Sequence, residues 1–176
     1  LIQYQRKISE KRERQTASGW LRRTFTNDQT MQRFRAHLDF RLSDGVRVHA
    51  RIEKVFLDAR IGTRREQGTM LYEDISYAPD RMLSVSARVV FFSTDSYETR
   101  LSEFENDLNG ATSLPALSGR GIRWYVLAKY RPGISWDLSA KYSRLMRDDL
   151  RHLGTGPDEL PANTDDRVGV QLDFRL

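Results

Sequence analysis

The stretch that decides the fold runs from Arg33 to Phe56, and it reads RFRAHLDFRL, then SDG, then VRVHARIEKVF. Apolar and polar residues alternate on both sides of the turn at 43–45. Alternation with a period of two around a glycine-containing turn is typical of a β-hairpin with two unlike faces. The polar face is dense in arginine with interspersed acids, so we expect its charges to face one another in an enclosed space.

The turn fixes the register of this hairpin. A three-residue turn over 43–45, with Gly45 in the left-handed conformation, sets Leu42 opposite Val46 and apolar residues opposite one another along the rest of the hairpin. A two-residue turn would set each apolar residue opposite a polar one, because side chains alternate between the two faces. The sequence therefore predicts the three-residue turn.

The same register predicts three cross-strand pairs on the polar face, which are Asp39 with His49, Arg35 with Glu53, and Arg41 with Arg47. The first two pairs are complementary in charge. The pairing of Arg41 with Arg47 places like charges directly opposite each other, which is unfavourable unless a carboxylate or water intervenes.

Alternation recurs along the chain and predicts about eight strands in all. The further strand segments are 1–8, 67–77, 82–92, 122–130, 134–142 and 167–176. Tight turns at 43–45, 78–80 and 131–133 alternate with longer connections near 9–29, 58–66, 93–121 and 147–165. All tight turns would then lie at one end of the sheet and all long loops at the other, which is the layout of bacterial outer-membrane barrels.

The predicted fold class is all-β: an up-and-down antiparallel membrane β-barrel that forms a single domain over residues 1–176. The sequence has no run of the roughly 20 apolar residues that a membrane helix needs, whereas a barrel strand needs only about 9–11 alternating residues. The chain begins with Leu1 rather than methionine, so we expect a processed chain or a fragment. The barrel is then either complete or the C-terminal part of a larger one, and the expected location is the bacterial outer membrane.

A soluble lipocalin-like barrel is the alternative, since it alternates in the same way with its apolar face inside. Aromatic residues near the strand ends favour the membrane, because they would form an interfacial girdle. These aromatic residues are Phe34, Phe56, Tyr77, Trp124, Tyr130, Trp136 and Tyr142. Glu73 and Lys54 fall on the apolar face and argue against a membrane barrel.

The two faces of the predicted barrel assign each strand residue to the lumen or to lipid. The charges expected in the lumen are Arg33, Arg35, His37, Asp39, Arg41, Arg47, His49, Arg51, Glu53, Arg167, Asp173 and Arg175. The residues expected to face lipid are Phe34, Leu38, Phe40, Val48, Ile52, Val85, Val89, Trp124, Trp136, Leu138, Val170, Leu172 and Phe174.

Three runs between residues 95 and 125 carry a resemblance to a known family: DSYETR at 95–100, FEND at 104–107 and LPALSGRGIRWY at 114–125. They resemble the C-terminal barrel region of bacterial outer-membrane proteins in which the barrel follows helix-hairpin-helix repeats. The repeats themselves are absent from this sequence. The resemblance implies the fold and the location, and it implies no reaction.

Residues that carry chemistry are scarce. His49 beside Asp39 could serve as a general base, but no serine is placed with them, and a lumen histidine satisfied by a carboxylate is the commoner arrangement. The paired aspartates at 148–149 and 165–166 lack the spacing of a calcium loop. We therefore expect no enzyme activity, no cofactor and no metal site.

The predicted partners are outer-membrane lipids and lipopolysaccharide, together with other envelope proteins that the long loops contact. A cationic stretch of Lys7, Lys11, Arg12, Arg14, Arg22 and Arg23, with Trp20 and Phe25 nearby, could hold lipopolysaccharide phosphates or remain solvated. Elsewhere the arginines are spread along strands, which argues against a nucleic-acid-binding face.

These observations predict a non-enzymatic structural, anchoring or complex-forming protein, because an eight-stranded barrel with an arginine-rich interior leaves no open pore. If the full barrel is larger, an anion-selective pore or transport component becomes the alternative. The second alternative is a soluble binder of an apolar ligand.

Overall fold

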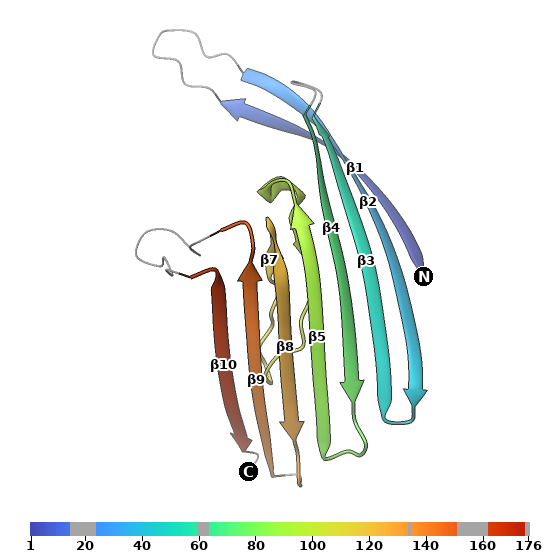
Figure 1. Cartoon of the computed structure of the whole chain (residues 1–176), viewed down its shortest axis with the longest axis vertical. Helices are drawn as coiled ribbons and strands as arrows, with labels where there is room; N and C mark the ends of the chain where they lie inside the picture. Colours follow the sequence, from blue (N-terminus) through green and yellow to red (C-terminus); the bar gives the residue numbers. More distant parts are fainter. Residues whose placement is uncertain (15–23, 60–63, 134, 151–161, 175–176) are drawn as a thin grey trace.

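The computed structural model describes residues 1–14, 24–59, 64–133, 135–150 and 162–174. One antiparallel sheet contains eight strands in chain order. They are β1 (Ile2–Arg14), β2 (Thr24–Ser43), β3 (Val46–Ala59), β4 (Arg64–Tyr77), β5 (Leu83–Thr94), β8 (Arg120–Tyr130), β9 (Trp136–Arg147) and β10 (Thr164–Phe174). The prediction of an all-β antiparallel fold with about eight strands is confirmed (Figure 1).

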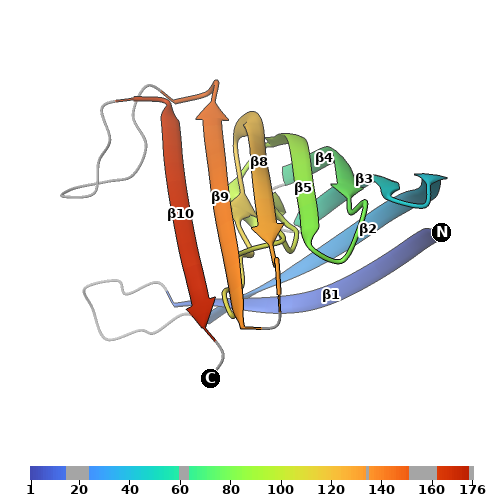
Figure 2. The same cartoon turned by 90° about the horizontal axis from the view of Figure 1, so that it is seen from below.

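The sheet curls but does not close into a barrel, so the prediction of closure within this chain is wrong. Among the described residues β1 pairs only with β2, and β10 pairs only with β9. A closed barrel needs a hydrogen-bonded ladder between its first and last strands. β1 and β10 lie on opposite sides of the curled sheet (Figure 1), and Figure 2 shows the curl of the strands between them from below.

The register of the β2–β3 hairpin is confirmed for its charged pairs. Arg35 lies opposite Glu53, Asp39 opposite His49, and Arg41 opposite Arg47. The apolar pairs follow the same register, and Phe40 lies opposite Val48. The predicted register and the observed one therefore agree for both the charged and the apolar pairs.

The turn itself differs from the prediction. Ser43 pairs with Val46, and the register shifts between Arg41 and Ser43. Gly45 is not among the glycines with positive φ, so the predicted left-handed conformation is wrong. A bulge inserts one extra residue into one strand, so the shift compensates for the shorter turn and keeps apolar residues opposite one another.

Several strands extend beyond the alternating segments. β1 continues to Arg14 and β2 begins at Thr24, so much of the connection expected near 9–29 is strand. Likewise β3 ends at Ala59 and β4 begins at Arg64 within the expected connection near 58–66, and β10 begins at Thr164. Ladder hydrogen bonds join backbone groups, so pairing continues where side-chain alternation has faded. The tight turns still lie together at one end of the sheet (Figure 1).

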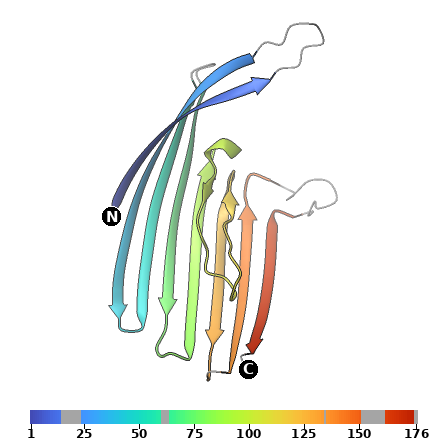
Figure 3. The same cartoon turned by 180° about the vertical axis from the view of Figure 1, so that it is seen from behind.

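The connection between β5 and β8 lies against the sheet. This segment, residues 95–119, contains a 3₁₀ turn η1 (Tyr97–Thr99) and the short paired strands β6 (Leu101–Ser102) and β7 (Ala116–Leu117). It runs along the concave side of the curled sheet (Figures 2 and 3). The long connection expected near 93–121 therefore folds back along the sheet and does not extend beyond its end. Its polar contacts with the strands, described below, hold it inside.

The core lies where this segment meets β3, β4 and β5. Its buried residues are Val55, Met70, Tyr72, Val90, Phe92, Leu101 and Leu117. Gly68 of β4 permits the approach, because a Cβ atom there would lie 2.4 Å from the carbonyl oxygen of Thr99. In the part of the chain that the structure describes, no helix is both long and apolar enough to cross a membrane.

Candidate functional site

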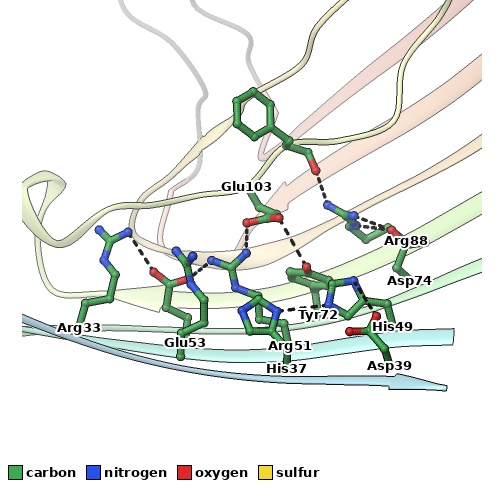
Figure 4. A network of polar contacts seen from close by, with 12 residues as sticks. Arg33, His37, Asp39, His49, Arg51, Glu53, Tyr72, Asp74, Arg88 and Glu103 are labelled. Carbon is green, nitrogen blue, oxygen red and sulfur yellow. Dashed lines mark hydrogen bonds and ion pairs between the residues drawn. The ribbon is translucent and has the colours of Figure 1, made fainter. Parts of the chain in front are cut away.

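We call the face of the sheet that contacts residues 95–119 the inner face, and the opposite face the outer face. The inner face carries most of the buried polar residues, from Arg51 on β3 to Lys141 on β9. Its charges form a series of ion pairs, several of which link the strands to the segment. Figure 4 shows the part of this series from Arg33 to Arg88. This network is the candidate functional site.

Glu53 lies at the β2–β3 end of the network and is fully buried. Arg33 approaches its Oε1 atom at 3.1 Å, and Arg35 donates from Nε to Oε2 at 2.9 Å. Arg51 forms a third ion pair with the same carboxylate. One buried acid thus neutralises part of the charge of three arginines. Arg51 also pairs with a second acid, Glu103.

Arg51 also joins the sheet to the segment, since it forms an ion pair with Glu103. The hydroxyl of Tyr72 lies 3.5 Å from the other oxygen of Glu103. A charge-assisted contact of this kind is stronger than a neutral hydrogen bond. Glu103 therefore tethers the segment to both β3 and β4.

Two histidines stack beside this tether (Figure 4). His37 Nδ1 lies 3.3 Å from His49 Nε2, and the rings are 5.6 Å apart between centroids. Asp39 lies 3.9 Å from His49 Nδ1, and the ring of Tyr72 meets His49 edge-on. The predicted proximity of His49 and Asp39 is present. The other ring nitrogen of His49, Nε2, contacts His37, whereas a general base would direct it toward a nucleophile.

Arg88 on β5 occupies the centre of the inner face. Its Nε donates to Asp74 at 2.9 Å, and its Nη1 donates to the backbone carbonyl of Phe104 at 2.6 Å. Its guanidinium lies over the rings of Tyr72 and Tyr125, 4.5 and 5.8 Å from their centroids. Burying this cation is compensated by an acid, a carbonyl and two aromatic faces together.

Glu105 anchors the middle of the segment. Arg123 donates to both of its oxygens, at 2.5 and 2.9 Å, and Lys141 lies 3.5 Å away. Lys141 also pairs with Asp107 at 3.1 Å. Three strands, β5, β8 and β9, thus hold the segment through buried cations.

The far end of the segment reaches β10. Asn109 donates to Asp173 at 2.9 Å, and Gln171 donates to the carbonyl of Asn109 at 3.1 Å. Lys129 of β8 donates to the side-chain oxygen of Asn109 at 3.1 Å. Arg167 pairs with Asp165 on its own strand. The segment therefore spans the inner face from β3 to β10.

The remaining predicted lumen charges have different surroundings. Arg41 and Arg47 are exposed near the tight turns and line a hollow there. Arg175 lies outside the described residues. No group of three or more histidine, aspartate or glutamate side chains in the described part of the chain is placed to hold a metal ion.

The outer face is apolar and largely uncovered. Of the residues predicted to face lipid, Phe34, Leu38, Phe40, Ile52, Trp136, Leu138, Val170, Leu172 and Phe174 are exposed. Val48, Val85, Val89 and Trp124 are half-buried among their neighbours. Glu73 and Lys54 are exposed on the same face, and Lys54 lies 5.0 Å from the ring centroid of Phe56.

Sequence reasoning missed the acids of the segment and their partners on β5, β8 and β9. A signal was present, because Glu103, Glu105 and Asp107 alternate with other residues as in an extended chain. Arg123 and Lys141 likewise occupy the polar positions of alternating strands. The pairing between them joins residues 18 or more apart in sequence, which alternation does not reveal.

Comparisons with protein-family models, with curated proteins and with solved structures found no match to this chain. The resemblance to outer-membrane proteins with helix-hairpin-helix repeats therefore stays a prediction.

Proposed function

We propose that this chain forms part of the wall of a bacterial outer-membrane β-barrel and acts as a non-enzymatic structural, anchoring or complex-forming protein. The observation that carries the proposal is the contrast between an uncovered apolar outer face and a charged inner face covered by residues 95–119. Outer-membrane barrels have an apolar exterior and a polar interior that a loop can plug.

The extent of the outer face supports contact with lipid. Exposed large apolar residues occur on β1, β2, β3, β4, β5, β8, β9 and β10. Soluble monomers rarely expose a contiguous apolar patch larger than a few hundred Å². A soluble apolar-ligand binder would enclose this face, whereas Phe40 is exposed and Val48 only half-buried.

The sheet has two open edges among its described strands, one on β1 and one on β10. In hydrocarbon an unpaired backbone N–H or C=O costs several kcal/mol, so sheets span membranes only as closed barrels. Within the described residues one edge of β1 and one edge of β10 have no strand partner. We infer that further strands pair with both edges and complete a larger barrel.

An experiment on the purified protein tests the location. The protein is partitioned between detergent and water, and the same sample is run with and without heating on a denaturing gel. Detergent-dependent solubility with heat-shifted migration is expected for a membrane barrel. A stable aqueous monomer without a shift would overturn the proposal and favour the soluble alternative.

An anion-selective pore is the second candidate. The observation that favours it is the excess of arginine on β2 and β3, where Arg33, Arg35, Arg41, Arg47 and Arg51 share this face with Asp39 and Glu53. Single-channel recording in planar bilayers separates the two functions. Steady anion-selective current would support the pore, and its absence would support the structural role.

Contact with lipopolysaccharide remains part of the proposal. Apart from Lys7, the cationic residues predicted to bind its phosphates lie in 11–23, whose side chains are outside the described residues. Because residues 95–119 lie against the inner face, envelope partners would bind the other long connections.

A further inference from the structure

Arg41 and Arg47 lie directly opposite each other on β2 and β3, beside the tight turn. Like charges in this position repel and destabilise the pairing of the strands. In the described part of the chain neither side chain forms an ion pair. Other arginines of the inner face do form ion pairs, among them Arg33, Arg35, Arg51, Arg88, Arg123 and Arg167. The Arg41–Arg47 pair therefore carries two positive charges that the protein itself does not neutralise by direct contact.

Arg41 and Arg47 both line a hollow of about 250 Å³. The hydroxyl-bearing residues Ser43 and Ser76 and the carboxylate-bearing Asp44 line it as well. Ser76 is the cross-strand partner of Arg47 on β4. Oxyanions accept hydrogen bonds from hydroxyl and guanidinium groups.

The turns around the hollow are held together. The backbone N–H of Ala78 donates to the carbonyl of Gly45 at 2.8 Å, which joins the β2–β3 turn to the β4–β5 turn. A Cβ atom at Gly45 would lie 3.2 Å from the carbonyl oxygen of Ala78, so the two turns are in close contact. A hollow bounded by two connected turns is more preorganised than one on a single free loop.

We propose that this hollow binds a compact oxyanion of the phosphate class. The two guanidinium forks supply paired donors in the geometry that phosphate oxygens match. Asp44 contributes one negative charge against two positive charges, which leaves the hollow cationic. Arg41 and Arg47 project from the face opposite the apolar one, so the oxyanion comes from solution and not from a lipid headgroup.

Inorganic phosphate is the probe for the test. Its binding is measured by equilibrium dialysis against the purified, folded protein in a phosphate-free, non-ionic detergent at constant ionic strength. Arg41→Gln and Arg47→Gln are each expected to weaken binding about tenfold. Asp44→Asn is expected to strengthen binding roughly threefold, because it removes the opposing charge.

Arg81→Gln is the matched control. Arg81 is exposed in the β4–β5 turn at the same end of the sheet and does not line this hollow. The Arg81→Gln substitution removes the same charge, and its affinity for phosphate should stay within about twofold of that of the original protein. Equal weakening by all three arginine substitutions would overturn the site, since it would indicate a diffuse field. Absence of phosphate binding to the original protein would also overturn it.

Two further measurements test whether the hollow binds phosphate from solution. Phosphate should raise the thermal unfolding midpoint of the original protein more than that of Arg41→Gln, because the stabilisation by a ligand falls as its affinity for the folded state falls. Anionic phosphatidylglycerol added to the micelles should leave phosphate binding unchanged. Displacement of phosphate by the lipid would contradict the statement that the bound oxyanion comes from solution. The result does not depend on membrane insertion, which the partition experiment measures separately.

Discussion

Arg123 on β8 and Glu105 in the segment 95–119 form a bidentate ion pair, with N–O distances of 2.5 and 2.9 Å. Their side chains are only 9% and 2% exposed. Two charges so deeply buried are costly to desolvate, so each depends on the other for its stability. The pair therefore couples the position of the segment to the fold of the sheet, and the covered inner face behaves as one unit with its strands.

Glu105→Gln should destabilise the protein by about 3–5 kcal/mol, because it leaves Arg123 buried without its counter-charge. Chemical unfolding followed by tryptophan fluorescence measures this loss, and limited proteolysis reports whether the segment detaches. Asp58→Asn is the control, since Asp58 pairs with Arg65 where the side chains are 50% and 90% exposed. The control should cost no more than about 1 kcal/mol. Similar losses in both variants would contradict the buried tether.

Gly68→Ala should loosen the segment where it crosses β4. The new Cβ atom would lie 2.4 Å from the carbonyl oxygen of Thr99, a backbone atom that moves only with the whole segment. We expect a loss of about 1–3 kcal/mol in the free energy of unfolding. Gly133→Ala serves as the comparison, because a Cβ atom there meets nothing within 4 Å. An unchanged Gly68→Ala variant would mean that the segment does not lie against β4.

Val126→Arg tests what surrounds the outer face. Val126 is 41% exposed in the middle of β8. In lipid the new charge should cost about 2–4 kcal/mol of folding free energy and impair insertion into vesicles. Leu114→Arg is the matched substitution at a position that is 52% exposed in the segment, and it should have little effect. If Val126→Arg is equally harmless, the outer face is in water.

The pH dependence of stability should include a contribution from Asp149, which follows β9. The hydrogen bonds donated by Arg147 lower the pKa of Asp149 below its ordinary value of 3.8. A depressed pKa in the folded state stabilises the protein above pH 3.8, and this stabilisation is lost as the pH falls through the lowered pKa. The contribution is small because solvent screens the pair, whose side chains are 19% and 33% exposed.

Asp149→Asn should therefore reduce the acid sensitivity of the unfolding midpoint between pH 5 and pH values below about 3.8. The measurement is a series of thermal unfolding curves for both proteins. At low pH the two proteins should converge, since Asp149 is then protonated in both the folded and the unfolded state. A constant difference across the whole range would exclude this carboxylate as the source.

The β2–β3 hairpin illustrates how far local pattern reaches. Arg35 opposite Glu53 and Asp39 opposite His49 were predicted from alternation and charge complementarity, and both pairs are present. The turn was predicted less well, because a two-residue turn with a bulge and a three-residue turn give the same pairing of the strands. Alternation constrains the faces and the register but not the backbone path that produces them.

The sequence by itself determined the strand class, the number and order of strands, the two unlike faces and the end at which the tight turns lie. These properties depend on neighbours one or two residues apart, or on one hairpin. Only the tertiary structure decided that the sheet stays open, that residues 95–119 cover the inner face, and that Glu105 meets Arg123 and Lys141. Those contacts join distant parts of the chain, so they follow from the curvature of the sheet and the cost of burying unpaired charge, which no local pattern encodes.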